Sequence, residues 1–216
     1  MPASSEETRR LLVEAATHEF ADHGVRGASL LEISRRAGQR NRASVHYHFG
    51  SRDGILAAVL SQHHRFLYPR NVELHAAAEK AAPGDLLPVV RALALPAIEI
   101  GETGPLGRGY LTILAELAVH GVDRTDPAVL EAMTTSGGYL NYQLLGEQLG
   151  AAQPGLPPAL RDLRRDKSCQ FLMRTVADRD RDLASAGEGM LPEAVSLEDY
   201  TANLIAMTVG MLSAPL

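Results

Sequence analysis

Apolar residues recur at three- and four-residue spacing along most of the chain, which is the period of an α-helix. Near the N-terminus, Leu12, Ala16 and Phe20 follow one another in steps of four. The last apolar run has steps of three, four, three and four over Leu197, Tyr200, Leu204, Met207 and Met211. The alternation of apolar and polar residues that is typical of strands is not evident. The pattern therefore predicts an all-α protein.

Serine and glycine divide the first fifty residues into three predicted helices. The predicted N-caps of the first, second and fourth helices are Ser4, Ser29 and Ser51. Gly24 and Gly38 follow apolar runs and are expected to end the first two helices, since glycine tolerates a left-handed C-cap. A third short helix is expected over residues 43–49, and Gly50 should break it.

The same pattern predicts helices for the remainder of the chain. A fourth helix is expected to begin after Ser51 and to run toward residue 80, with a kink at Pro69. Further helices are expected at residues 86–101, 110–120, 127–148, 158–183 and 196–213. Loops are expected at residues 101–109, 153–158 and 184–195, where most of the stretches are rich in glycine and proline.

Composition favours a cytoplasmic protein with a sizeable core. The chain has 216 residues, of which 45% are hydrophobic, so strong disorder is not expected. Its single cysteine, Cys169, excludes an internal disulfide and fits a reducing compartment. The N-terminus has no long apolar run, so we expect no secretory signal. No apolar stretch reaches the roughly 18 residues that a membrane-spanning helix requires, so no membrane span is expected.

Positive charge gathers in residues 24–52. That segment contains Arg26, Arg35, Arg36, Arg40, Arg42 and Arg52, against one acid, Glu32. The formal charge of the whole chain is −5, so this is a compact basic element on an acidic protein. Such an element points to a polyanion, because neutralising phosphates releases counterions. Two short helices joined by a glycine-containing turn suggest that the polyanion is duplex DNA.

Several residues of this segment occur in the order and near the spacing found in one protein family. They are Phe20, Gly24, Ser29, Ile33, Ala37, Gly38, Tyr47, His48, Phe49, Arg52 and Leu56. In these positions the first 60 residues or so resemble the TetR family of bacterial transcriptional regulators. The resemblance implies an N-terminal three-helix, helix-turn-helix DNA-binding domain, residues 1–50. It also implies a helical domain that binds a small-molecule effector and forms the homodimer, residues 51–216.

The resemblance implies a ligand-responsive regulator without a cofactor. We expect a repressor that binds a pseudo-palindromic operator as a homodimer and is released by its effector. Two departures from the family pattern affect base reading. Eight residues, Gln39–His46, separate Gly38 from Tyr47, where many members have one fewer, and His46 stands where an aromatic or small polar residue is commonest.

The recognition helix of a helix-turn-helix protein enters the major groove by its N-terminal end. Arginine suits guanine, and asparagine suits adenine, so Arg42 and Asn41 are expected at base edges and Arg40 near base or phosphate. The resemblance implies phosphate contacts for Ser29, Tyr47, His48 and Arg52. The complete expected DNA-binding set is Ser29, Arg40, Asn41, Arg42, Ser44, His46, Tyr47, His48 and Arg52. For each arginine, a solvated surface charge is the competing interpretation.

Two further sets are expected in the second domain. Candidate residues of a mostly apolar effector pocket are Phe66, Tyr68, Tyr110, Met133, Tyr139, Tyr142 and Met173, with packing in the core as the competing interpretation. Methionine and leucine linings would suit an aliphatic or acyl compound. Candidate residues of the dimer interface are Cys169, Leu172, Val176, Leu197, Tyr200, Leu204, Met207 and Met211. The same seam could instead pack inside one chain, as an antiparallel helix pair.

Other chemistry has weaker support. His46 and His48 do not share a helix face, so we expect no metal site. The glycines of residues 101–109 lack the lysine and the preceding strand of a phosphate loop. We interpret Cys169 as a buried structural thiol. A small helical enzyme and an architectural DNA-binding protein without effector remain the alternative functions. In the regulator, a ligand against Phe66 or Tyr68 is expected to tilt the fourth helix, with Pro69 affecting the coupling.

Overall fold

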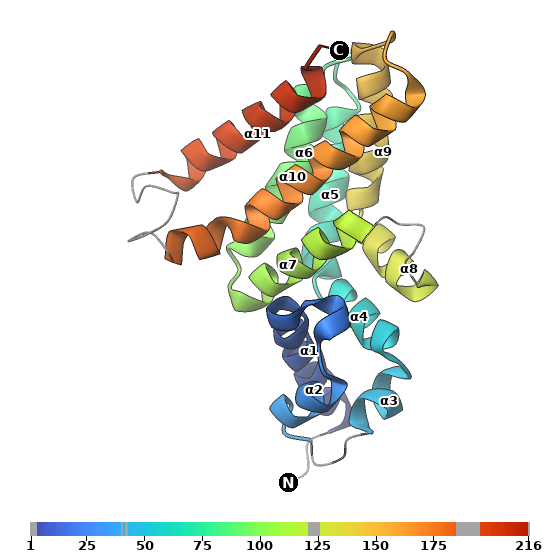
Figure 1. The fold of residues 1–216 in the computed structure, drawn as a ribbon, viewed down its shortest axis with the longest axis vertical. Helices are drawn as coiled ribbons and strands as arrows, with labels where there is room; N and C mark the ends of the chain where they lie inside the picture. Colours follow the sequence, from blue (N-terminus) through green and yellow to red (C-terminus); the bar gives the residue numbers. More distant parts are fainter. Residues whose placement is uncertain (1–3, 40, 42, 121–125, 185–194, 216) are drawn as a thin grey trace.

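The computed structural model describes residues 4–39, 41, 43–120, 126–184 and 195–215, and these form an all-α molecule (Figure 1). The N-terminal unit comprises α1 (Ser5–Gly27), α2 (Leu30–Arg36), α3 (Ser44–Phe49) and α4 (Arg52–Ser61). The C-terminal unit comprises α5 (His64–Ala78), α6 (Leu86–Gly101), α7 (Pro105–His120), α8 (Pro127–Thr135), α9 (Gly138–Ala152), α10 (Pro158–Ala184) and α11 (Leu197–Ser213). The predicted fold class is confirmed.

The N-terminal unit has its own apolar centre. The side chains that fill it come from all four helices and are almost completely buried: Leu12, Phe20, Ile33, Val45, Ile55 and Val59. Burial of these side chains fixes α2 against α1 and α3 against α4. Figure 1 places α2 and α3 at the end of the molecule opposite α11.

The predicted serine caps are confirmed. The hydroxyl of Ser4 accepts from the N–H of Glu7, that of Ser29 from Glu32, and that of Ser51 from Gly54, at 3.1, 3.3 and 3.0 Å. Gly38 and Gly50 have positive φ after α2 and α3, as expected. Gly24 also has positive φ (78°) but breaks α1 without ending it, because the N–H of Ala28 still reaches the carbonyl of Gly24.

The predicted fourth helix is divided differently from the expectation. It ends at Ser61, and α5 begins at His64, so the interruption is at Gln62–His63. The expectation of one continuous helix from Ser51 toward residue 80 was therefore wrong, and Pro69 lies inside α5.

Two other boundaries need correction. Helix α7 begins at Pro105, so most of the loop expected over residues 101–109 is helical; proline at the first helical position loses no hydrogen bond. The helix expected over residues 127–148 is two helices, because Gly137 adopts φ +82° between α8 and α9. A side chain there would also crowd α5, since an added Cβ would lie 3.0 Å from Cβ of Asn71. The loop expected at 184–195 falls almost wholly outside the described residues.

The seam between α10 and α11 packs mainly inside the chain. Leu172, Val176, Tyr200 and Leu204 are buried within the single chain, so their predicted place in a dimer interface was wrong. Cys169 and Leu197 are partly buried against the same core. Only the two methionines remain substantially exposed, Met207 at 48% and Met211 at 38%. In an antiparallel helix pair, the apolar stripe of each helix packs against the other helix of the same chain.

The two units pack against each other through α1 with α7 and α4 with α8. Gly109 permits the first of these contacts, since an added Cβ would lie 2.9 Å from the Cγ2 methyl of Thr17. Gln62 adds a hydrogen bond from its side-chain amide to the hydroxyl of Thr17, at 3.0 Å. Among the described helices, none has the length and apolar character needed to cross a membrane.

Candidate DNA-binding surface and ligand pocket

The exposed face of α3 carries the most prominent residue of the predicted DNA-binding set. Tyr47 is 82% exposed, and its ring meets the ring of His48 edge-on with centroids 4.9 Å apart. His46 is exposed as well, but its Nδ1 donates to the carbonyl of Gly50 at 3.0 Å, which ties the ring to the end of the helix. Arg40 and Arg42, the predicted base-reading arginines, lie outside the described residues.

The turn before α3 uses two predicted DNA-binding residues to hold itself together. The side-chain oxygen of Asn41 accepts from the N–H of Ala43 at 2.9 Å, as in an Asx turn. The hydroxyl of Ser44 is buried and donates to the carbonyl of Asn41 at 2.6 Å. Ser44 is therefore removed from the surface, and the carboxamide oxygen of Asn41 already has a partner in the free protein.

Arg52, for which the resemblance implies a phosphate contact, makes structural contacts in the DNA-free protein. Its guanidinium donates to the carbonyls of Val25 and Ala28, at 3.0 and 2.7 Å. These contacts fasten the end of α1 to the start of α4. Ser29, by contrast, remains exposed, with its N–H donating to the carboxylate of Glu19 at 3.1 Å.

The positive charge of the N-terminal unit is partly neutralised by neighbouring acids. Arg35 pairs with Glu32 at 2.7 Å, and Arg36 lies 3.4 Å from Asp22 and 3.6 Å from Glu19. Glu19 is buried, so its position in the centre of this group is fixed by packing. The charge seen in the sequence of residues 24–52 is thus smaller at the surface than the count of arginines indicates.

Arg9 is a residue of this surface that the sequence did not indicate. Its guanidinium donates to the carbonyl of His48 at 2.9 Å and lies 4.3 Å from the ring centre of Phe49. It therefore holds the C-terminal end of α3 against α1. The two partners are 39 residues apart in the chain, so no local pattern could have revealed the contact.

A cavity of about 410 Å³ lies within the C-terminal unit. Its lining comprises Leu67, Asn71, Leu93, Pro96, Ala97, Ile100, Tyr110, Leu111, Leu114, Ala118, Leu130, Met133, Thr134, Ser136, Gly138, Tyr139, Tyr142, Asp166, Cys169, Gln170 and Met173. Five of the residues expected to line a pocket do so: Tyr110, Met133, Tyr139, Tyr142 and Met173. The expectation was wrong for Phe66 and Tyr68, which point to solvent on α5; their neighbour Leu67 lines the cavity instead.

One side of the cavity carries a layered group of polar side chains. The hydroxyl of Tyr142 donates to Asp166, and the guanidinium of Arg165 lies 4.3 Å from the ring centre of Tyr142. Tyr139 stacks on Tyr142 with centroids 5.8 Å apart. Cys169, expected at the dimer seam, lines the cavity, where burial raises the pKa of its thiol to about 12. This thiol is protonated at neutral pH and is a poor nucleophile.

The N-terminal unit is where this chain resembles known proteins in sequence. The family model for bacterial regulatory proteins, tetR family, matches residues 12–59. The N-terminal unit belongs to the TetR family. Over 59 residues it is 41% identical to the transcriptional regulator SrpR and 39% identical to the uncharacterized regulator TtgW, both of Pseudomonas putida. Each alignment covers 27% of this chain; the matched segments span 27% and 43% of those two relatives.

The fold of the whole chain is also that of solved TetR-type regulators. An alanine-substituted mutant of HlyIIR aligns over 100% of both chains with a TM-score of 0.62 and 16% identity. AmtR of Mycobacterium smegmatis aligns over 96% of this chain and 87% of its own, with a TM-score of 0.56 and 18% identity. The ketosteroid regulator KstR2 of Mycobacterium tuberculosis covers 97% of this chain and 95% of its own, with a TM-score of 0.55 and 17% identity.

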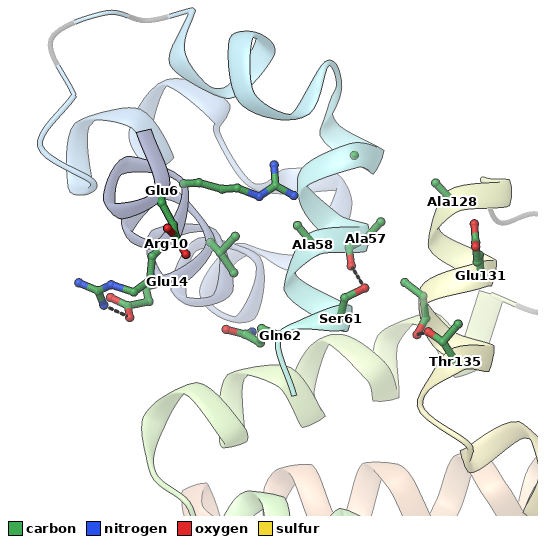
Figure 2. A pocket seen from close by; sticks show the side chains of 14 residues that line it. Glu6, Arg10, Glu14, Ala57, Ala58, Ser61, Gln62, Ala128, Glu131 and Thr135 are labelled. Atoms are coloured by element: carbon green, nitrogen blue, oxygen red, sulfur yellow. Dashed lines mark hydrogen bonds and ion pairs between the residues drawn. The ribbon is translucent and has the colours of Figure 1, made fainter. Parts of the chain in front are cut away.

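Between the TetR-type unit and α8 lies an open groove of about 680 Å³. Figure 2 shows Ala57 and Ser61 on the side of α4 that faces Ala128 and Thr135 of α8. Such short side chains let two helices approach closely. Glu6, Arg10 and Glu14 of α1 border the opposite side of the groove, and Arg9 is also part of its lining.

Proposed function

We propose that this protein is a ligand-responsive transcriptional repressor. In this proposal residues 1–50 bind DNA, and residues 51–216 bind a small-molecule effector and form the homodimer. The TetR-type helix-turn-helix and the cavity in the helical unit support the two activities separately. An operator-bound dimer would release its DNA when the effector favours a different arrangement of the two units.

The observation that carries the proposal is that two helices serve the cavity and the DNA-binding unit at once. Helix α8 lines the cavity with Leu130 and Met133, and lines the groove against α4 with Ala128 and Ala132. A molecule seated against one face of α8 therefore bears on the helix that leads into the recognition element. Coupling between distant sites requires an element of this kind, whose position both sites influence.

Helix α7 provides a second connection. Tyr110, Leu111 and Leu114 line the cavity, while Glu116 on the same helix accepts the N–H of Val25 at the end of α1. A shift of α7 would thus be transmitted directly to α1. Tyr110 also touches His63, at the break between α4 and α5, with ring centroids 5.2 Å apart.

On the DNA side, we assign phosphate contacts to Ser29, Tyr47 and His48. We assign base contacts to Asn41 and Arg42, and we place Arg40 near a base or a phosphate. The exposure of Tyr47 supports its part of this assignment, because its hydroxyl can reach a phosphate without rearrangement. A bidentate contact with adenine would use both the amide N–H and the oxygen of the Asn41 side chain. That oxygen would first have to give up the hydrogen bond that it accepts from the N–H of Ala43.

The dimer is proposed to form through the outer face of α10 and α11. The described parts of these two helices carry four large exposed apolar residues, namely Leu160, Leu163, Met207 and Met211. The two helices are joined where α10 begins and α11 ends, since Arg164 donates to the carbonyls of Leu212 and Ala214. A second copy packing on this face would cover apolar surface that otherwise meets water.

The test is selection of bound duplexes from a random pool, followed by titration of the selected operator with candidate metabolites. We expect a pseudo-palindrome with half-sites about 34–36 Å apart, or a small multiple of that distance. Absence of any enriched sequence would overturn the proposal and leave the enzyme alternative. Sequence-specific binding that no bound metabolite weakens would instead favour an architectural DNA-binding protein.

A further inference from the structure

The lining of the cavity of about 410 Å³ contains one acid, Asp166, and no lysine, arginine or histidine among the described residues. Cys169, Gln170 and Met173 also line the cavity, and they follow Asp166 at three, four and seven positions along α10. Residues at this spacing share one face of a helix, so Asp166 lies on the face that α10 presents to the cavity. Its side chain is 45% exposed, so a bound molecule can reach the carboxylate.

The carboxylate of Asp166 has one oxygen that no protein donor uses. The hydroxyl of Tyr142 and Nε of Arg165 both donate to Oδ1, the second of them at 3.3 Å. No donor among the described residues reaches Oδ2. An ionised carboxylate has about four acceptor sites on its two oxygens. Asp166 can therefore accept a hydrogen bond from a bound molecule without giving up either of the existing ones.

The negative charge of Asp166 is only partly balanced by its neighbour Arg165. The guanidinium of Arg165 also lies 3.3 Å from Asp162, so one positive charge is shared by two carboxylates and the three side chains keep a net negative charge. The thiol of Cys169 responds to the same imbalance. Burial is the main cause of its raised pKa, Asp166 raises that pKa further, and the opposing effect of Arg165 is smaller. The part of the cavity beside Asp166 therefore favours a positive charge.

Three hydroxyls of the lining have already given their protons to acceptors within the protein. Those of Thr134 and Ser136 donate to carbonyls within α8, and that of Tyr142 donates to Asp166. Each of these oxygens can still accept a hydrogen bond, but its single proton is in use. Together with Asp166, these groups favour a ligand that brings hydrogen-bond donors of its own.

We propose that the effector is a protonated amine with a mainly apolar body, whose N–H groups donate to Asp166. This proposal rests on the assignment of the cavity as the effector site in the proposed function. The apolar body of the molecule would lie against side chains such as Leu111, Leu114 and Met133. A carboxylate with the same body would bring a like charge beside Asp166, and it would lose its hydration without a basic side chain in the described lining to replace it.

The test uses compounds that share a body and differ in the polar group. One series is octan-1-amine, octan-1-ol and octanoate, and the other is 4-phenylbutan-1-amine, 4-phenylbutan-1-ol and 4-phenylbutanoate. Near neutral pH the amines are protonated and the acids are ionised. Calorimetry on the DNA-free, full-length protein should show the tightest binding for the amine of at least one series. Its alcohol and its carboxylate should bind more weakly, the carboxylate by roughly ten-fold or more.

Asp166→Asn removes the charge while keeping a side-chain oxygen that can accept from Tyr142. This variant should weaken amine binding by roughly ten-fold and leave alcohol binding unchanged, because a hydrogen bond to a charged group is stronger than one to a neutral group. The matched control is Asp162→Asn. It removes the other carboxylate that pairs with Arg165, but Asp162 does not line the cavity, so amine affinity should stay close to that of the wild type.

The order of the wild-type affinities requires no variant, so the test holds even if Asp166→Asn lowers the melting temperature. An alcohol or a carboxylate that binds as tightly as its amine, or no binding by either amine, would overturn the proposal. Unchanged amine affinity in folded Asp166→Asn would overturn it as well. An amine that binds through Asp166 without weakening operator binding would count against the regulatory function and leave the ligand class standing.

Discussion

Glu116 receives the backbone N–H of Val25 on both oxygens of its carboxylate, at 3.1 and 3.0 Å. The two residues belong to different units, since Glu116 lies on α7 and Val25 on the last turn of α1. The kink at Gly24 precedes this contact, and a Cβ at position 24 would lie 3.3 Å from Glu116. Helix α7, which lines the cavity, thus holds the end of α1 through hydrogen bonds from a backbone N–H to a carboxylate.

Glu116→Ala should loosen the connection between the two units. The N–H of Val25 is buried and would lose its acceptor, so we expect a loss of about 1–3 kcal/mol in the free energy of unfolding. The effect of a bound ligand on operator affinity should also decrease. Urea denaturation and operator titration with and without ligand measure the two effects. Glu147→Ala, an exposed acid on α9, is the control. Undiminished coupling would show that transmission bypasses Glu116.

Arg52→Ala should destabilise the protein as well as weaken DNA binding. The guanidinium bonds two carbonyls at the junction of α1 and α2, and their loss should lower the free energy of unfolding by about 1–3 kcal/mol. Binding to all duplex sequences should weaken to a similar degree. The control is Arg26→Ala, because Arg26 is exposed and has no partner among the described residues. A denaturation midpoint equal to that of the wild type would contradict the structural role of Arg52.

Features set by neighbouring residues were predictable from the sequence. The serine caps are examples, because Ser29 bonds a residue only three positions away. Helix breaks set by tertiary packing were not. Gly137 fits the apolar spacing of a continuous helix, and only the approach of Asn71 shows why the chain must turn there. Likewise, neither residue at the break, Gln62 or His63, is a glycine or a proline, so the local sequence did not indicate the break.

The same distinction holds for the candidate sites. Aromatic and methionine residues of the second unit correctly indicated much of the cavity lining, since such residues on helices face the interior. Their helix faces did not distinguish Leu67 from Phe66 and Tyr68, because all three lie on one turn of α5. The role of Arg52 depends on carbonyls 24 and 27 residues away, and no sequence spacing encodes that contact.

Tyr47 and Arg42 should differ in how they affect DNA recognition. Tyr47→Phe removes an exposed hydroxyl assigned to phosphate, so affinity should fall evenly across operator variants without a change in stability. Arg42→Ala should cost about 1–3 kcal/mol on the specific operator and relax base preference. Binding to a library of single-base operator variants at fixed salt separates the two patterns. An even loss in Arg42→Ala would rule out base reading by that residue.

Charge placed on the outer face of α11 should prevent dimer formation. The double change Met207→Glu with Met211→Glu would bring like charges together across a two-fold axis and remove exposed apolar contacts. Sedimentation should show a dimer for the wild type and a monomer for the variant, with much weaker operator binding. Leu87→Glu introduces the same charge at an exposed apolar site on α6 and serves as the control. A dimer that survives the double change would place the interface elsewhere.

His63 should make stability depend on pH below neutrality. Burial lowers the pKa of its imidazole from the ordinary value of 6.5, although its hydrogen bond to the backbone of Leu106 acts in the opposite direction. As the pH falls through 6.5, the unfolded chain takes up a proton at this position before the folded chain does, so the free energy of unfolding decreases. Above 6.5 the imidazole is neutral in both states and contributes no pH dependence.

Urea denaturation at about pH 7.5 and 5.5 should therefore show a smaller acid-induced loss of stability in His63→Gln than in the wild type. His18→Gln, at an exposed position on α1, should lose as much stability as the wild type. Equal losses in His63→Gln and the wild type would mean that His63 accepts its proton as readily in the folded protein as in the unfolded chain.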